Sequence, residues 1–275
     1  MPLPFGPPAF SSILPRAFDP YHHRVVTLRD IARLDLGYFT MPDRPGDPLS
    51  DQAISVCAYL IRHGRGLFLF DTGLAKADPE TEAYYHPVPW PVDAQLKRLG
   101  VKTDEIAAVA NCHLHFDHSG GNRHFAKRPI FAQRTEYAAA HEPDYTMPIV
   151  VEFADATYEL LDGEAEIWPG LRVIPTPGHS DGHQTLIVDT DHGRIALAGQ
   201  SFNTTSDFAA AQLAWQLERT GWPHPAGYPE WMARLEAYEP IRVLFAHDVA
   251  VWERGAAPPP RRGRGRKRAS EARRR

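Results

Sequence analysis

The feature that most constrains this chain is the segment His113-Leu114-His115-Phe116-Asp117-His118, in which four metal-competent side chains fall within six residues. The first two histidines are two residues apart, so at the end of an extended strand their side chains project the same way. The aspartate and the third histidine follow where the chain can turn, at Ser119-Gly120-Gly121. Neutral imidazole and carboxylate suit zinc and other borderline divalent ions. The segment therefore predicts a loop that offers ligands to one metal ion or to two.

The rest of the chain predicts an α/β fold. Apolar runs bounded by turn residues predict strands, and Pro91 near a start and Gly100 just past an end mark one of the helices. The predicted strands cover residues 53–61, 66–70, 106–111, 129–132, 171–175, 184–189, 194–198 and 241–246, the predicted helices cover 91–99, 134–141, 208–219 and 229–238, and 75–89 is a predicted loop. Two groups of strands, each followed by helices, favour two sheets packed face to face with helices outside.

Three further strands are predicted to end in turns with polar residues. These turns are Pro177-Gly178-His179-Ser180, Ala198-Gly199-Gln200-Ser201 and Phe245-Ala246-His247-Asp248. Glycine lets a chain turn sharply and present the residue that follows it. Rigid sheets commonly position functional side chains on the loops at their strand ends. We therefore expect these turns to meet the loop at residues 113–118.

In order and spacing, these segments resemble the metallo-β-lactamase superfamily, and within it most closely the N-acyl-homoserine lactonase group. The resemblance covers roughly residues 50–255 and is carried by Leu69-Phe70-Asp71-Thr72-Gly73, by residues 113–122, by Pro177-Gly178-His179 and by residues 245–248. It implies a four-layer αββα sandwich, the metallo-β-lactamase fold. It also implies a metal-dependent hydrolase that cleaves a lactone or ester bond, and a quorum-quenching role.

The resemblance implies two metal subsites. His113, His115 and His179 would hold the first ion, and Asp117, His118 and His247 the second. Asp71 would accept a hydrogen bond from a ligand histidine and orient it, a role that metal-bound imidazoles need filled. The implied cofactor is Zn²⁺, as one ion or two, with Fe²⁺ or another divalent metal as the alternative.

The chain departs from the lactonase pattern at Gln200, where the lactonases place an aspartate that bridges both metals. A neutral glutamine leaves Asp117 as the single anion among the implied ligands, so we expect one subsite to be weaker. Three outcomes stay open: a three-histidine zinc site alone, a two-histidine, one-carboxylate site that also suits Fe(II), or a pair to which Gln200 binds weakly.

The second departure is Asn203, at the position of a lactonase tyrosine that is thought to polarise the lactone carbonyl. An asparagine amide can also donate a hydrogen bond to an oxyanion. In the expected reaction, a metal-activated hydroxide attacks the carbonyl, Asn203 assists, and Asp117 passes a proton to the leaving alkoxide. Aromatic and apolar residues in loops favour a small-molecule substrate with an apolar acyl group: Phe39, Tyr84, Tyr85, Trp90, Met147, Phe153, Phe202 and Phe208.

Two other functions remain as alternatives. A mononuclear iron site on the same scaffold could oxygenate a thiol or sulfur compound, whereas a diiron pair is disfavoured because it needs a carboxylate where His115 stands. A metal-depleted binding module is the second alternative, and the intact ligand set argues against it.

Outside that set, His124, His141, His183 and His192 are assigned surface or supporting roles, with His183 supporting the turn after His179. Cys112 is expected to be buried and to point away from the ligands.

The predicted organisation has three parts. Residues 1–50 form an N-terminal arm that ends in a strand or two and packs on the core, residues 51–257 form the metal-binding domain, and 258–275 form a basic, disordered tail.

Residues 261–275 hold nine Lys or Arg and one acidic residue, so this stretch carries +8 while the remaining chain carries −12. Such a tail could contact nucleic acid, but a solvated tail without a specific partner is the preferred interpretation, because it lacks base-reading residues. The oligomeric state stays open.

The sequence offers three observations on where the protein is expected to reside. Residues 1–12 are rich in proline and do not resemble a signal peptide. No apolar run approaches the length that a bilayer requires, so no membrane partner is expected. Two isolated cysteines, Cys57 and Cys112, do not make a disulfide framework. These observations favour a cytoplasmic location.

Overall fold

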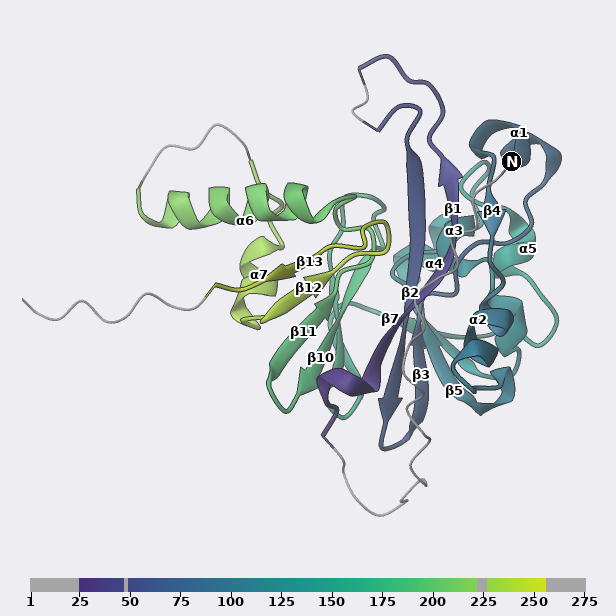
Figure 1. Cartoon of the computed structure of the whole chain (residues 1–275), viewed down its shortest axis with the longest axis horizontal. Coiled ribbons are helices and arrows are strands. Elements are labelled where there is room, and N and C mark those ends of the chain that lie inside the picture. The colour runs from purple at the N-terminus through teal and green to yellow at the C-terminus, as the bar shows by residue number, and fades with distance from the viewer. Residues whose placement is uncertain (1–24, 47–48, 222–226, 256–275) are drawn as a thin grey trace, which may run out of the picture.

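The computed structural model describes residues 25–46, 49–221 and 227–255, so the predictions for residues 1–24 and for the tail at 258–275 lie outside the described residues. Two sheets face each other, with helices on the outer side of each (Figure 1). Helices α6 and α7 cover one sheet, and α2 lies on the outer side of the other. This is the predicted four-layer αββα sandwich.

The first sheet has seven strands in the order β4-β1-β2-β3-β5-β6-β7. Its strands are β1 (Ile31–Thr40), β2 (Ala53–His63), β3 (Gly66–Phe70), β4 (Val88–Pro89), β5 (Ile106–Ala110), β6 (Pro129–Gln133) and β7 (Thr157–Leu161). The predicted hairpin of β2 and β3 is present and antiparallel. The strand expected at the end of the N-terminal arm is β1, which pairs with β2 inside the sheet.

The second sheet has six strands in the order β13-β12-β11-β10-β9-β8. Its strands are β8 (Ala165–Trp168), β9 (Leu171–Pro175), β10 (Gln184–Thr190), β11 (Gly193–Leu197), β12 (Arg242–Leu244) and β13 (Val251–Glu253). The helices are α1 (Pro79–Tyr85), α2 (Val92–Arg98), α3 (Phe116–Ser119), α4 (Arg134–Ala139), α5 (Pro148–Val151), α6 (Thr205–Arg219) and α7 (Met232–Ala237), and three short 3-10 turns are η1 (Leu28–Asp30), η2 (Thr103–Glu105) and η3 (Asn122–Phe125). Among the described residues, no helix is long and apolar enough to cross a membrane.

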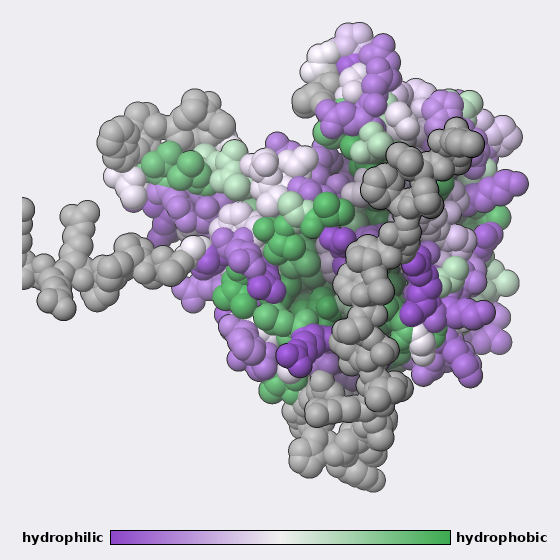
Figure 2. Space-filling model, viewed as in Figure 1, coloured by the Kyte–Doolittle hydropathy of each residue, from purple (hydrophilic) through white to green (hydrophobic). Residues whose placement is uncertain are grey.

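Burial of both strand faces explains why the central strands read as continuous apolar runs. On β10, Leu186 and Val188 face the core between the sheets, and Ile187 faces the core under α6 and α7. On β3, Phe68 and Phe70 face the first of these cores, and Leu69 packs on the α2 side. A strand with helices on one side and a sheet on the other has no face left for water. In the view of Figure 2, apolar residues gather in the middle of the molecule and hydrophilic residues surround them.

Several short elements were not predicted. The predicted loop at 75–89 contains α1 and β4, and α1 begins where Asp78 accepts hydrogen bonds from the backbone N–H groups of Glu80 and Thr81. This cap followed by Pro79 is a regular start signal that the loop prediction missed. The other unpredicted elements are α3, α5, β7, β8, β13 and the three 3-10 turns. The three strands lie at sheet edges, where half-exposed residues carry no continuous apolar run and pairing with a neighbour fixes the strand.

Parallel pairing brings the predicted strand-end turns to one edge. Strands β3 and β5 run parallel, so the segments that follow them, at Asp71 and at Asn111, start side by side. A β-carbon on Gly120 would lie 2.1 Å from the backbone nitrogen of Ala75, and one on Gly121 would lie 2.5 Å from the carbonyl oxygen of Thr72. Glycine at both positions therefore lets the loop at residues 113–118 close against the turn that follows β3.

Candidate metal centre

Three histidines from two loops converge at the first cluster. The Nδ1 atom of His115 lies 2.9 Å from Nε2 of His113 and 3.1 Å from Nε2 of His179. His113 follows β5, His115 immediately precedes α3, and His179 lies in the turn after β9. The structure thus brings together the three histidines that the sequence assigned to one metal subsite, and we call them the three-histidine cluster.

A second cluster adjoins the first. His118 Nε2 lies 3.3 Å from Asp117 Oδ2 and 3.1 Å from His247 Nε2. His247 Nε2 also lies 3.3 Å from Asp117 Oδ2. The two clusters touch, because the rings of His113 and His118 have centroids 4.1 Å apart. Side chains from α3 and from the turn after β12 therefore form one continuous group with the three-histidine cluster.

The hydrogen bonds behind the histidines leave ring nitrogens free to bind a cation. His247 Nδ1 donates to the carbonyl oxygen of Ser55 at 2.8 Å, so the neutral ring keeps its lone pair on Nε2. His118 Nδ1 lies 3.2 Å from Asp71 Oδ2, so its Nε2 likewise faces the cluster. In the three-histidine cluster, three ring nitrogens meet within hydrogen-bond distance. Several lone pairs directed at one point suit a cation, so the residues fit a divalent metal.

The pKa shifts of these groups show where the site stabilises positive charge. Burial, with smaller contributions from the surrounding imidazoles, holds the pKa of His113 well below its usual value, so this ring is neutral. Burial opposes ionisation of Asp117, but His118 and His247 hold its pKa well below the usual range. Burial also opposes charge on His118, yet Cys112 and Asp117 raise its pKa well above the usual value. A positive charge is therefore stabilised beside Asp117.

Gln200 and Asn203 lie next to the second cluster. Gln200 Oε1 is 3.1 Å from His118 Nε2, and Gln200 Nε2 donates to Asn203 Oδ1 at 3.1 Å. Asn203 is exposed. The glutamine oxygen therefore adjoins the ligand nitrogens, while the asparagine oxygen is occupied by Gln200.

His183 and a group of polar residues that the sequence did not single out support these loops. His183 Nε2 accepts a hydrogen bond from the Gln200 backbone N–H at 3.1 Å, and its Nδ1 lies 2.8 Å from Thr176 Oγ1. His183 is fully buried, in the supporting role assigned to it in the turn after His179. Glu136, Tyr145 and Ser180 form another buried network. No local pattern marks these residues, because burial of a carboxylate in a short helix depends on the loops that pack over it.

The expectation that Cys112 points away from the ligands was wrong. The residue is fully buried as expected, but its Sγ lies 3.2 Å from His113 Nδ1 and 3.3 Å from His118 Nδ1. The chain leaves the extended conformation after β5, so alternation of side chains no longer holds there. The thiol packs behind the two imidazoles, on the side opposite their Nε2 atoms.

An aromatic wall flanks the second cluster. Phe39 packs edge-on to His247, with ring centroids 5.7 Å apart, and it also contacts Tyr85 and Phe116. Other residues proposed to line a substrate pocket lie elsewhere. Phe208 is fully buried in the core under α6, so this prediction was wrong. Phe202 is half-buried and packs against Phe208, and its predicted place in a substrate pocket stays a prediction.

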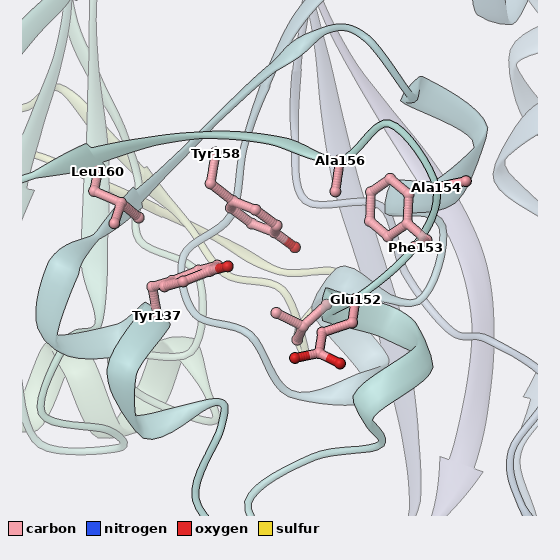
Figure 3. Close-up of a pocket in the computed structure, with 8 residues that line it drawn as sticks. Tyr137, Glu152, Phe153, Ala154, Ala156, Tyr158 and Leu160 are labelled. Atoms are coloured by element: carbon pink, nitrogen blue, oxygen red, sulfur yellow. The ribbon is translucent and has the colours of Figure 1, made fainter.

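A pocket of about 580 Å³ lies between α4 and β7 (Figure 3). Its lining residues are Tyr137, Val151, Glu152, Phe153, Ala154, Ala156, Tyr158 and Leu160. None of the clustered histidines or Asp117 lines this pocket. It is therefore separate from the candidate metal centre.

Comparison with known proteins agrees with this fold. The family model of the metallo-beta-lactamase superfamily matches residues 53–239. An N-acyl homoserine lactonase of Bacillus thuringiensis is 32% identical over 169 residues, which cover 56% of this chain and 67% of the relative. N-acyl homoserine lactonase AiiB of Agrobacterium fabrum is 26% identical over 245 residues, covering 76% of this chain and 85% of the relative.

A solved structure of an N-acyl homoserine lactone hydrolase, with the product N-hexanoyl-L-homoserine bound at its catalytic metal centre, superposes with a TM-score of 0.65. The two sequences are 26% identical, and the match covers 82% of this chain and 95% of the other. The family model spans more than half of this chain, and the superposition shows that the neighbour shares its fold. This chain belongs to the metallo-beta-lactamase superfamily.

Proposed function

We propose that this protein is a metal-dependent hydrolase that opens a lactone or cleaves an ester, with N-acyl homoserine lactones as the first substrate class to test. The observation that carries the proposal is the pair of adjoining clusters, which directs five imidazoles and one carboxylate to one region. The relatives named as N-acyl homoserine lactonases, and the neighbour that holds an acyl-homoserine product at its metal centre, support this substrate class.

The proposed metal is Zn²⁺, as one ion or two. His113, His115 and His179 would hold one ion, and Asp117, His118 and His247 the other, with Gln200 beside the second. When bound, such an ion lowers the pKa of a water molecule toward neutrality and polarises a carbonyl oxygen. Iron or another divalent metal would fit the same nitrogen and oxygen donors.

The residues of this chain supply the rest of the chemistry. Asp117 is buried and ionised, so it can accept a proton from water and return it to the leaving alkoxide. Asn203 adjoins Gln200, and its amide N–H groups are the proposed donors to the carbonyl oxygen that becomes negative. The aromatic wall of Phe39, Tyr85 and Phe116 offers an apolar surface for an acyl chain.

The proposal is tested with the full-length protein loaded with zinc. Ring opening of N-acyl homoserine lactones with short and long acyl chains is followed by proton release, and the product is identified by mass spectrometry. We expect turnover by the native protein and loss of turnover in Asp117→Asn. Absence of hydrolysis across lactones and simple esters, with the metal bound, would refute the proposal.

One alternative has a specific observation in its favour. Asp117, His118 and His247 form a two-histidine, one-carboxylate group, which also suits mononuclear Fe(II) oxygenases. Metal identity separates the two functions. Oxygen uptake with a thiol substrate by iron-loaded protein, without lactone hydrolysis by the zinc form, would favour the oxygenase.

We also propose a cytoplasmic location, from the sequence features given above. Fractionation of the source cells, followed by detection of the full-length protein, would test it. Recovery in the membrane or secreted fraction would contradict it.

A further inference from the structure

Glu136 is a buried carboxylate that joins the segments carrying the three-histidine cluster. It lies on α4 and is 1% exposed. Its Oε1 accepts a hydrogen bond from the backbone N–H of Leu114 at 2.8 Å and another from the hydroxyl of Tyr145. Its Oε2 accepts one from the hydroxyl of Ser180 at 2.6 Å. Three neutral donors therefore stabilise this buried carboxylate.

Each donor is linked to a histidine of the cluster. Leu114 lies between His113 and His115 in the chain, so its N–H fixes the backbone from which both project. Ser180 directly follows His179. The ring of Tyr145 packs against the ring of His115, with centroids 4.6 Å apart. One carboxylate thus holds the backbone or the ring next to every member of the three-histidine cluster.

Close packing adds to these hydrogen bonds. A β-carbon on Gly182 would lie 2.3 Å from the backbone nitrogen of Glu136 and 2.4 Å from its Cβ. The turn that carries His179 therefore rests directly on the first turn of α4. Hydrogen bonds and van der Waals contact together fix the distance between that turn and the helix.

The second cluster has different supports. Asp71 contacts His118, and the carbonyl oxygen of Ser55 accepts from His247. His183 holds the backbone of Gln200. Glu136 contacts none of these groups in the described part of the chain. Cys112 contacts a histidine of each cluster, but the hydrogen bonds of Glu136 reach only the segments that carry the first cluster.

We propose that Glu136 is the positioning residue of the three-histidine subsite and sets its metal affinity, without contributing to the Asp117, His118 and His247 subsite. The proposal builds on the proposed function, because it assumes that both halves bind metal. Glu136 touches neither substrate nor metal in this scheme, and it acts through Leu114, Ser180 and Tyr145. Outer partners of metal ligands commonly change metal affinity by about 10- to 100-fold.

The test measures zinc affinity in two backgrounds of the full-length protein, each of which leaves one subsite. His247→Ala leaves the three-histidine subsite, and His179→Ala leaves the other. In each background, the zinc dissociation constant is determined by competition with a chromophoric chelator, with and without Glu136→Gln. Glutamine keeps the shape of the side chain but removes its charge and one acceptor. Circular dichroism verifies that each variant is folded.

We expect Glu136→Gln to weaken zinc binding about 10- to 100-fold in the His247→Ala background. In the His179→Ala background, we expect a change of no more than about twofold, because Glu136 shares no hydrogen-bond partner with the second cluster in the described part of the chain. Ser180→Ala removes one donor and should give a smaller loss in the same background. The matched control is Glu236→Gln, another buried carboxylate that pairs with Arg254 on the far side of the second sheet, and it should change neither constant.

Equal weakening in both backgrounds would mean a general loss of structure and would overturn the proposal. An unchanged affinity in the His247→Ala background would overturn it as well, and so would an absence of zinc binding by that parent. A subsite-selective loss in a protein that hydrolyses no lactone or ester would instead refute the proposed function and leave the role of Glu136 standing.

Discussion

The side-chain oxygen of Gln200 lies 3.1 Å from Nε2 of His118, so a neutral amide occupies the place where the lactonase pattern has a carboxylate. The amide nitrogen is turned toward Asn203, and the backbone nitrogen is held by His183. Gln200 therefore already presents its oxygen to the second cluster. What it lacks is negative charge. Among the described residues, Asp117 is the single carboxylate whose oxygen lies within 3.3 Å of Nε2 of His118 and of His247, because Asp71 contacts His118 at Nδ1 instead.

The first prediction concerns metal number. Gln200→Asp adds an anion next to two cations, so binding of the second zinc ion should tighten by about tenfold or more. Zinc titration of the metal-free protein by calorimetry, with plasma mass spectrometry for content, measures the two steps. Gln200→Asn, which stays neutral, is the control. Two equally tight zinc ions in the native protein, unaffected by the aspartate, would show that charge at this position does not limit occupancy.

Metal removal should affect both activity and stability. Chelation removes the cation to which the histidine nitrogens and Asp117 are directed, so lactone hydrolysis should cease and return on addition of zinc. A metal present at 100 times its dissociation constant stabilises the folded state by about 2.7 kcal/mol. Thermal unfolding with and without chelator measures this change. Hydrolysis that persists at full rate in protein shown to be metal-free would contradict the metal-dependent mechanism.

Asn203 should act on the chemical step. If its amide donates to the developing oxyanion, Asn203→Ala should lower kcat by about 10²-fold with little change in KM. The same substitution also frees the amide of Gln200, so Asn203→Asp is the informative partner variant. Aspartate keeps the oxygen that accepts from Gln200 but loses the donor. Steady-state kinetics in which Asn203→Asp retains full activity would assign the residue to positioning Gln200 instead.

Cys57 should be chemically inert in the folded protein. Burial raises the pKa of its thiol to about 12, and the side chain is 1% exposed. The thiolate is the reactive form, and it becomes populated only as the pH approaches this pKa. Alkylation by iodoacetamide should therefore stay negligible from pH 7 to 9 in native protein and become rapid in urea. Mass spectrometry of the Cys57 peptide measures it, and rapid alkylation of the native protein whose rate levels off between pH 7 and 9, as for an exposed thiol, would contradict the expectation.

Gly120 should tolerate no side chain. Its φ of −55° and ψ of −31° suit any residue, so only space limits the position. A β-carbon there would lie 2.1 Å from the backbone nitrogen of Ala75. Gly120→Ala should lower the free energy of unfolding by about 1–3 kcal/mol. Urea unfolding followed by circular dichroism measures the loss. Gly255→Ala is the near-neutral control, because no atom of the described residues, chain neighbours aside, would lie within 4 Å of its β-carbon.

Much of the fold could be predicted because its central strands are locally encoded. Strands such as β3, β5 and β10 are buried on both faces, so their apolar runs and flanking turns are visible in the sequence. Edge strands β7, β8 and β13 were not predicted, because half-exposed residues give no such run. Helix boundaries differ from the prediction where an N-cap hydrogen bond fixes the start of the helix. Helix α6 begins at Thr205 and not at 208, because Thr204 accepts the N–H of Asp207.

The kinds of side chain in the centre could be predicted from the sequence alone, because the metal-competent residues occur at short spacings and directly after predicted strands. Their convergence was decided only by the tertiary structure. His115 and His179 are 64 residues apart, and His118 and His247 are 129 apart, yet their nitrogens lie 3.1 Å from each other. The bracing by Glu136 and the inward turn of Cys112 depend on which loops pack over them. Burial and hydrogen bonding between distant segments leave no periodic trace in the chain, so these features become visible only once the sheets are folded together.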